Sequence, residues 1–262
     1  MDDSIGLAFD PSKSKSKKDC GYTLVHPMRS NASRINGAEY RFMVLPSQDR
    51  GRGWTESEQA VLSVENQLWK ESKPVFANGF LYWNCTDYLL WFRCCENEPA
   101  SAGYILMPRQ SSSFVEQEVG VCGDRVTFTR LSCESLDVWV LLQDNVGRSK
   151  RWEQIYGVCL ERMVQGNTHV FSPLCCGTAR LRSRKKISDG LVFRYQMLPL
   201  PFEGGDKVLF RVMPRRNSKK LETKVLSFDM KSGKMTEVFR GELLFQDDSL
   251  SFGYVKSLAC LP

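Results

Sequence analysis

The chain has 262 residues, of which 42% are hydrophobic and 11% are aromatic, which is enough apolar material for a packed core and excludes general disorder. Its formal net charge of +6 is mild for this length and does not by itself favour nucleic acid as a partner. No stretch approaches the roughly 20 apolar residues that cross a bilayer as a helix, and the N-terminus does not resemble a secretory signal, so we expect a cytoplasmic or nuclear protein.

The first part of the chain alternates short apolar runs with polar turns, which predicts strands. The expected strands are Gly6–Phe9, closed by an Asp-Pro turn signal, then Tyr22–Val25 and Tyr40–Leu45. A polar, glycine-bearing surface loop is expected over Ser47–Glu58. Residues Ser57–Asn66 fit either a short helix or a strand, and Val61–Trp69 fits a first hairpin unit.

Strand signals become dense after Pro74. Asn78-Gly79 stands between two apolar runs over Val75–Trp83, and Asn-Gly tolerates the positive φ angles of a tight hairpin turn. Further hairpins are expected around Gly123-Asp124 and Ser232-Gly233. The remaining expected strands are Leu89–Phe92, Gly103–Pro108, Leu136–Leu142, Trp152–Tyr156, Gly190–Tyr195, Lys207–Val212 and a closing strand within Phe252–Leu261.

The hairpins recur along the chain, and a single hairpin cannot bury both faces of its sheet. Stacked copies can, as in a propeller or a solenoid. Aligning Val64, Phe92, Trp139 and Phe228 gives intervals of 28, 47 and 89 residues; the last two fit one and two blades of about 40–50 residues, and the first does not. We therefore predict an all-β, propeller-like array of antiparallel blades, closed or incomplete, with little helix and one domain over residues 1–262.

The ten cysteines do not predict a metal site. No Cys-x-x-Cys occurs, only His26 and His169 could assist, and adjacent residues such as Cys94 and Cys95 point to opposite faces of a strand. We expect free thiols that behave as small apolar core residues in a reducing compartment. No metal ligand and no cofactor-binding residue is predicted.

The sequence also favours a non-enzymatic role. Glycine-rich phosphate loops and Gly-x-Ser-x-Gly elbows are absent from it, and we interpret the two histidines as structural or exposed. The carboxylate pairs Glu96/Glu98 and Asp247/Asp248 are interpreted as loop residues. Trp54, beside arginines, is either an interface anchor or a side chain packed on the nearest blade. The other strand tryptophans, Trp83, Trp91, Trp139 and Trp152, are predicted to be core residues, and Tyr82 and Trp83 to face opposite ways.

Several phrases, taken in order, resemble the C-terminal F-box-associated, kelch-like region of plant F-box proteins. They are Gly6–Ser12, Val61–Ser72, Val75–Trp83, Leu136–Leu142 with Trp152, Val225–Phe239 and Val255–Cys260. Each phrase is loose, and their order along nearly the whole chain carries the resemblance. The family's helical F-box, which docks on a Skp-type adaptor of a cullin ubiquitin ligase, is not evident in residues 1–60.

The resemblance implies a substrate-recognition subunit of a ubiquitin ligase, here a fragment, a truncated paralogue or an isoform lacking the F-box. It implies binding of a protein substrate, with adaptor and cullin as partners only in a longer form that has an F-box. Two alternatives remain open. One is a propeller-like enzyme acting on a small ligand. The other is a basic nuclear scaffold that binds an acidic partner through clusters such as Lys13–Lys18, Arg180–Lys186 and Arg215–Lys220.

Overall fold

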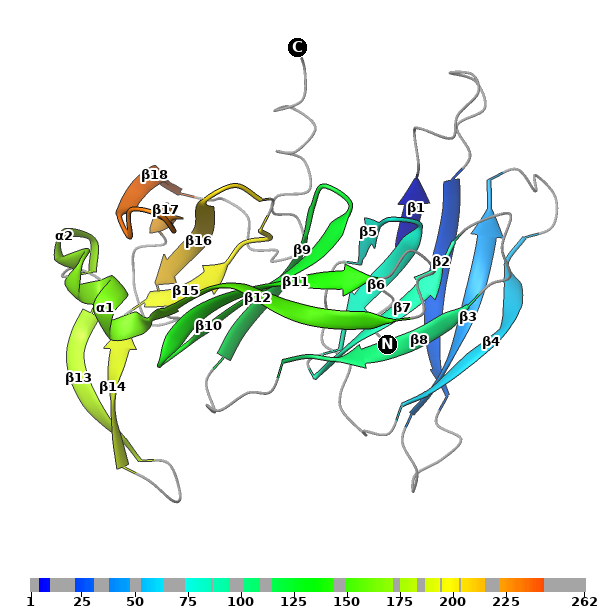
Figure 1. Cartoon of the computed structure of the whole chain (residues 1–262), viewed down its shortest axis with the longest axis horizontal. Coiled ribbons are helices and arrows are strands. Elements are labelled where there is room, and N and C mark those ends of the chain that lie inside the picture. The colour runs from blue at the N-terminus through cyan, green and yellow to red at the C-terminus, as the bar shows by residue number, and fades with distance from the viewer. Residues whose placement is uncertain are drawn as a thin grey trace, which may run out of the picture. The chain divides into compact units, whose positions relative to one another are not determined.

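The computed structural model of the chain describes residues 5–9, 22–30, 38–47, 53–63, 74–85, 87–94, 101–108, 115–143, 149–171, 175–182, 187–193, 195–202, 204–214 and 222–242. These residues form eighteen strands and two short helices (Figure 1). The chain divides into unit 1, Met1–Cys159 with Pro201–Gly205, and unit 2, Leu160–Leu200 with Asp206–Pro262. The single domain over 1–262 stays a prediction. Neither described helix has the length and apolarity needed to cross a membrane.

Unit 1 contains three four-stranded antiparallel sheets, and each follows the chain in order (Figure 1). The first sheet is β1 (Gly6–Phe9), β2 (Tyr22–Ser30), β3 (Ala38–Pro46) and β4 (Thr55–Ser63). The second is β5 (Val75–Ala77), β6 (Phe80–Asn84), β7 (Tyr88–Arg93) and β8 (Ala102–Leu106). The third is β9 (Val115–Cys122), β10 (Arg125–Ser132), β11 (Ser135–Gln143) and β12 (Lys150–Cys159). The all-β prediction is confirmed for the described residues.

The predicted hairpin turns explain the local order of these strands. Asn78 and Gly79 adopt φ angles of 48° and 80°, and they join β5 to β6 with Ala77 directly opposite Phe80. Gly123 has a φ of 58° in the turn between β9 and β10. Such two-residue turns match the twist of the strands that they connect.

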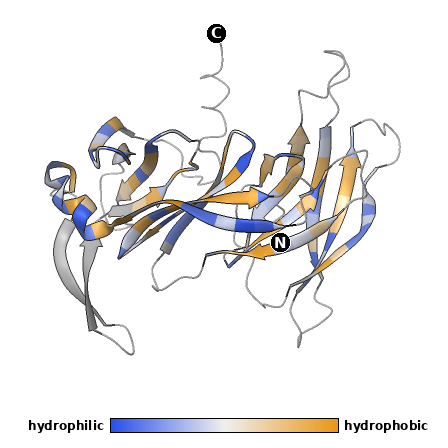
Figure 2. Cartoon of the chain, viewed as in Figure 1, coloured by the Kyte–Doolittle hydropathy of each residue, from blue (hydrophilic) through white to orange (hydrophobic). Residues whose placement is uncertain are grey.

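The second sheet packs against a neighbour on each face, so its strand β6 is buried on both sides. Trp83 belongs to the core shared with the first sheet, whereas Tyr82 belongs to the core shared with the third. These two residues do face opposite ways, as predicted, and both are buried because a neighbouring sheet covers each side of β6. Hydrophobic residues run along the strands of unit 1 (Figure 2).

Two cores, the first between the first and second sheets and the second between the second and third sheets, are rich in aromatic side chains. Phe42 lies between Phe92 and Trp83, with ring centroids at 4.8 and 6.2 Å. In the other core, Phe128 contacts Trp139 and Trp152. The prediction of four core tryptophans holds fully for Trp83 and Trp139 only. Trp91 and Trp152 are half-buried at the edge of the second core. There Trp91 lies against Gly103, and the Trp152 indole donates to the Leu106 carbonyl at 3.0 Å.

A short segment from later in the chain completes unit 1. The Thr127 hydroxyl donates to the Phe202 carbonyl at 2.8 Å. A Cβ atom at Gly120 would lie 2.8 Å from the backbone nitrogen of Phe202, so the third sheet needs glycine there for Pro201–Gly205 to approach. Phe202 itself is buried.

Unit 2 contains a two-stranded sheet, a four-stranded sheet and two short helices (Figure 1). Its elements are α1 (Leu160–Gln165), α2 (Thr168–Phe171), β13 (Cys175–Arg182), β14 (Ile187–Phe193), β15 (Tyr195–Pro199), β16 (Lys207–Pro214), β17 (Glu222–Asp229) and β18 (Met235–Glu242). Asn167 joins the helices to the β17–β18 turn. Its amide donates to the carbonyls of Met163 and Gly233 at 2.8 Å each, and its oxygen accepts from the Met235 nitrogen at 2.6 Å.

Two sequence expectations differ from the structure. Residues Thr55–Ser63 form one strand paired with β3, so the surface loop expected over Ser47–Glu58 ends before Thr55. The segment Ser57–Asn66, for which helix and strand were both open, is a strand up to Ser63. A hairpin over Val61–Trp69 falls partly outside the described residues, as does a closing strand within Phe252–Leu261. The helices α1 and α2 were not predicted; buried Leu160 and Met163, three positions apart, were the available signal.

Candidate recognition surface

The first sheet has an apolar face that remains exposed. Strand register places the side chains of Leu7, Phe9, Tyr22, His26 and Met28 on one side of β1 and β2, because directly paired residues share a face. We call this side the outer face. It continues through Met43 and Leu45 of β3 to Trp54, which comes just before β4.

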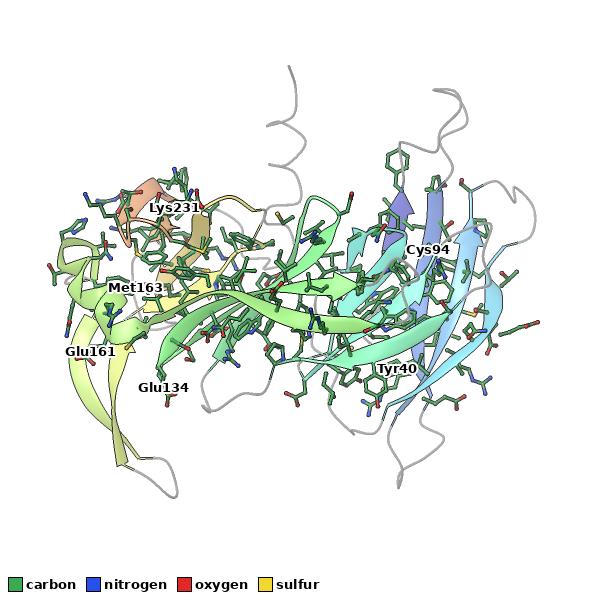
Figure 3. The ribbon with its side chains drawn as sticks, viewed as in Figure 1. Tyr40, Cys94, Glu134, Glu161, Met163 and Lys231 are labelled. Atoms are coloured by element: carbon green, nitrogen blue, oxygen red, sulfur yellow. The ribbon has the colours of Figure 1, made fainter. Side chains whose placement is uncertain are left out.

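The same strands bury their opposite side. Ala8, Val25, Tyr40 and Phe42 are buried against the second sheet, and Tyr40 is labelled in Figure 3. On the outer face, by contrast, Leu7 is 53% exposed and Tyr22 is 44% exposed. The first sheet therefore has two apolar faces, of which one is packed and the other meets solvent. Isolated exposed apolar residues are ordinary, but contiguous groups mark interaction sites.

Trp54 stands on this outer face. Its side chain is 39% exposed, and its ring meets His26 edge-on at 6.5 Å between centroids. Of the two interpretations of Trp54, the exposed one fits better, although one ring edge has a neighbour. His26 is therefore a surface residue beside an aromatic ring, and its expected non-catalytic role stays a prediction.

Charged side chains border the outer face. Arg41 of β3 donates to Glu39 at 3.2 Å and to Glu56 of β4 at 3.0 Å. Arg41 and Glu56 are about half exposed, so these pairs contribute little to stability. In protein interfaces generally, charges at the rim restrict which partner can dock and in which orientation.

The described residues offer little for chemistry elsewhere. They contain no group of three or more His, Cys, Asp or Glu side chains placed to hold a metal ion. The buried Asp137 carboxylate binds Arg130 at 3.1 Å, Ser135 at 2.6 Å and Gln154 at 2.9 Å. Through these hydrogen bonds Asp137 connects β10, β11 and β12. Glu96, Glu98, Asp247 and Asp248 lie outside the described residues.

The thiols differ in their surroundings. Five cysteines are free among the described residues: Cys85, Cys94, Cys122, Cys133 and Cys159. Cys85 is buried in the first core, and burial raises its pKa to about 12. It behaves as the predicted core thiol. Cys159 is exposed, so the prediction of core cysteines does not extend to it.

We expect iodoacetamide at pH 8 to alkylate Cys159 rapidly in the folded protein and to leave Cys85 unmodified until urea is added. The thiolate is the reactive form, and burial withholds it. Peptide mass spectrometry measures both sites. The folded state favours the neutral Cys85 thiol. The contribution of this burial to folding stability is therefore fully present below about pH 9, and it is lost as the pH rises toward 12. Equal rates at the two cysteines would contradict this burial.

No family model matches the chain, and neither a curated protein nor a solved structure matches it. The sequence indicated Trp54 as a candidate interface residue, whereas the apolar face around it was not predicted. The signal was present in Ile5–Phe9, where Leu7 and Phe9 alternate with Gly6 and Ala8, because bulky residues on one side and small ones on the other indicate two different environments.

Proposed function

We propose that this chain is a non-enzymatic protein-recognition module whose partner docks on the outer face of the first sheet. The exposed apolar surface formed by Phe9, Tyr22, Met28 and Trp54 carries this proposal. Aromatic residues, methionine and arginine are enriched in protein interfaces. Tryptophan and tyrosine in particular supply much of the binding free energy. The partner is expected to be a protein that presents its own apolar side chains to this face.

The three sheets of unit 1 support a propeller-like architecture. Each is a four-stranded antiparallel meander in chain order, and β15–β18 of unit 2 repeats that order. In unit 1 the first strands are neighbours, β1 beside β5 and β5 beside β9, while the last strands β4 and β8 are neighbours too. First strands that meet in series are the pattern of propeller blades around an axis. We propose that these sheets are blades.

The sequence phrases shared with plant F-box-associated regions suggest the pathway. By that resemblance the module holds a protein substrate for a ubiquitin ligase in the cytoplasm or nucleus. The adaptor and the cullin would join only through an F-box in a longer form. The module would then act by positioning, since holding two reactants together raises their effective concentration.

Site-specific crosslinking tests the recognition surface. A photoreactive phenylalanine analogue at Phe9 is expected to capture a defined partner, and the control position is Leu106, an exposed apolar residue of β8. With the captured partner purified, we expect the double variant Tyr22→Ser, Trp54→Ala to weaken binding by at least about tenfold, as for interface anchors. Measurement is by calorimetry on variants with unchanged circular dichroism.

Three results would count against the proposal. The Phe9 and Leu106 probes could capture the same proteins equally, or the double variant could bind as well as the parent chain. A large thermal shift with a nucleotide or sugar would instead favour an enzyme. Separately, stoichiometric co-purification of this chain with a Skp-type adaptor would contradict the prediction that it lacks an F-box.

A further inference from the structure

Unit 2 contains a pocket that is distinct from the outer face and independent of the proposed docking there. The pocket has a volume of about 320 Å³ and lies where α2 meets β17 and β18. Its floor is apolar, with Leu226 and Met235 both buried. Its charged rim consists of Lys224, Glu237 and Arg240, with His169 beside them.

The rim charges are ordered by hydrogen bonds. Glu237 accepts from Lys224 Nζ at 3.1 Å, and from Arg240 at 2.7 Å through Nε and 2.9 Å through a terminal nitrogen. The bond to Arg240 and the neighbouring Lys224 lower the pKa of Glu237 to about 2. Among the described residues that line the pocket, Lys224 and Arg240 are basic and Glu237 is acidic. An ammonium group has three donors, of which Glu237 takes one from Lys224.

We propose that this pocket binds an acidic side chain of a peptide or protein, with the carboxylate at Lys224, Arg240 and His169 and an apolar neighbour on Leu226 and Met235. Acidic groups are attracted by the basic side chains of the rim and can accept a hydrogen bond from the Lys224 ammonium group, which has three donors. The volume lies at the lower end for ligand pockets, which suits one or two side chains. None of the described residues that line the pocket is Phe, Tyr or Trp, so these residues offer nucleobases no stacking platform.

A second pocket in unit 1 serves as a comparison. It measures about 210 Å³ and lies beside the hairpin turns at Asn78 and Asp124. Among the described residues that line it, the charged ones are Asp124 and Arg125, one of each sign. This balance gives no preference for an anion. The unit 2 pocket differs in combining two cations, a histidine and an apolar floor.

Nuclear magnetic resonance tests the proposal directly, because the chain contains only two histidines. The probe is acetyl-Leu-Glu-Leu-amide, and acetyl-Leu-Gln-Leu-amide is its uncharged match. The glutamate peptide is expected to shift the imidazole resonances of His169 and to leave those of His26 unchanged. The variant His169→Gln assigns the signals. The glutamine peptide is expected to bind at least about threefold more weakly, as for the loss of one partly exposed charge pair.

Three variants give the sharpest outcome. Glu237→Gln removes the competing anion, and we expect it to bind the glutamate peptide about three- to tenfold more tightly, a gain that misfolding cannot mimic. Lys224→Met is expected to weaken binding by a similar factor. Its matched control is Lys231→Met, since Lys231 (Figure 3) also pairs with a carboxylate, Asp206, at 2.7 Å. This control is expected to bind like the parent chain.

Equal binding of the two peptides would overturn the proposal, and so would weaker binding by Glu237→Gln. Equal losses of affinity in Lys224→Met and Lys231→Met would show that the peptide responds only to the net charge of the protein, which would also overturn the proposal. If a single-stranded oligouridylate shifted the His169 resonances at lower concentration than the peptide, the site would take nucleic acid instead. None of these outcomes depends on the outer face of the first sheet.

Discussion

Replacing Phe42 by alanine is expected to lower the free energy of unfolding of unit 1 by about 3 to 5 kcal/mol. Phe42 is fully buried between the first and second sheets, where it contacts Phe92 and Trp83. Its removal leaves a cavity that two sheets with fixed hydrogen-bonded strands cannot close. Urea unfolding followed by tryptophan fluorescence measures the change, because all six tryptophans lie within residues 1–159 and hence within unit 1.

The matched control is Phe9→Ala in the same sheet. Phe9 lies on the outer face and is 41% exposed, so we expect a loss of less than about 1 kcal/mol. The two substitutions remove the same atoms from opposite sides of one sheet. If they destabilised unit 1 equally, the outer face would be packed in solution and unavailable to a partner.

The second large effect is expected in unit 2, from Asn167→Ala. The Asn167 side chain is fully buried and makes three hydrogen bonds, to Met163 (Figure 3), Gly233 and Met235. Alanine leaves the backbone groups of these three residues without that partner, and each unsatisfied buried group costs about 1–3 kcal/mol. Allowing for relaxation, we expect a total loss of about 3 kcal/mol. Hydrogen exchange measured by mass spectrometry over β18 reports it, with faster exchange of the Met235 amide.

Gln165→Ala controls for the loss of a carboxamide from the same helical segment. Gln165 is exposed, and its side-chain amide donates to its helical neighbour Glu161 at 3.1 Å. Its replacement is expected to change stability by no more than about 0.5 kcal/mol. If Asn167→Ala were equally mild, the attachment of α1 and α2 to the β17–β18 turn would not depend on this side chain.

Local sequence signals predicted much of the fold. Asn78-Gly79 indicated its hairpin because few other dipeptides adopt two positive φ angles, and the hairpin of β17 and β18 followed from two apolar runs on either side of the polar turn at Ser232-Gly233. What the sequence could not provide was the environment of each face. Tyr82 and Trp83 look alike in a strand, and only the presence of sheets on both sides makes both of them core residues.

The candidate sites were harder to predict. On the outer face, Phe9 of β1 and Tyr22 of β2 are far apart in the sequence. Their proximity depends on the register in which the two strands pair. In the unit 2 pocket, the β17–β18 pairing shifts register between Val225 and Leu226. That irregularity places Lys224 and Glu237 side by side in a way that regular alternation does not give. His169 comes from a helix that the sequence did not predict.

The late position of Pro201–Gly205 has a consequence for biosynthesis. At roughly 5 to 20 residues per second, residues 160–200 leave the ribosome after the third sheet and before Phe202. During those seconds the Thr127 hydroxyl has only water as a partner, and the apolar side chains around it are not covered by Phe202. We expect nascent chains in which Cys159 but not Phe202 has left the exit tunnel to be more susceptible to protease than those in which Gly205 has also left it.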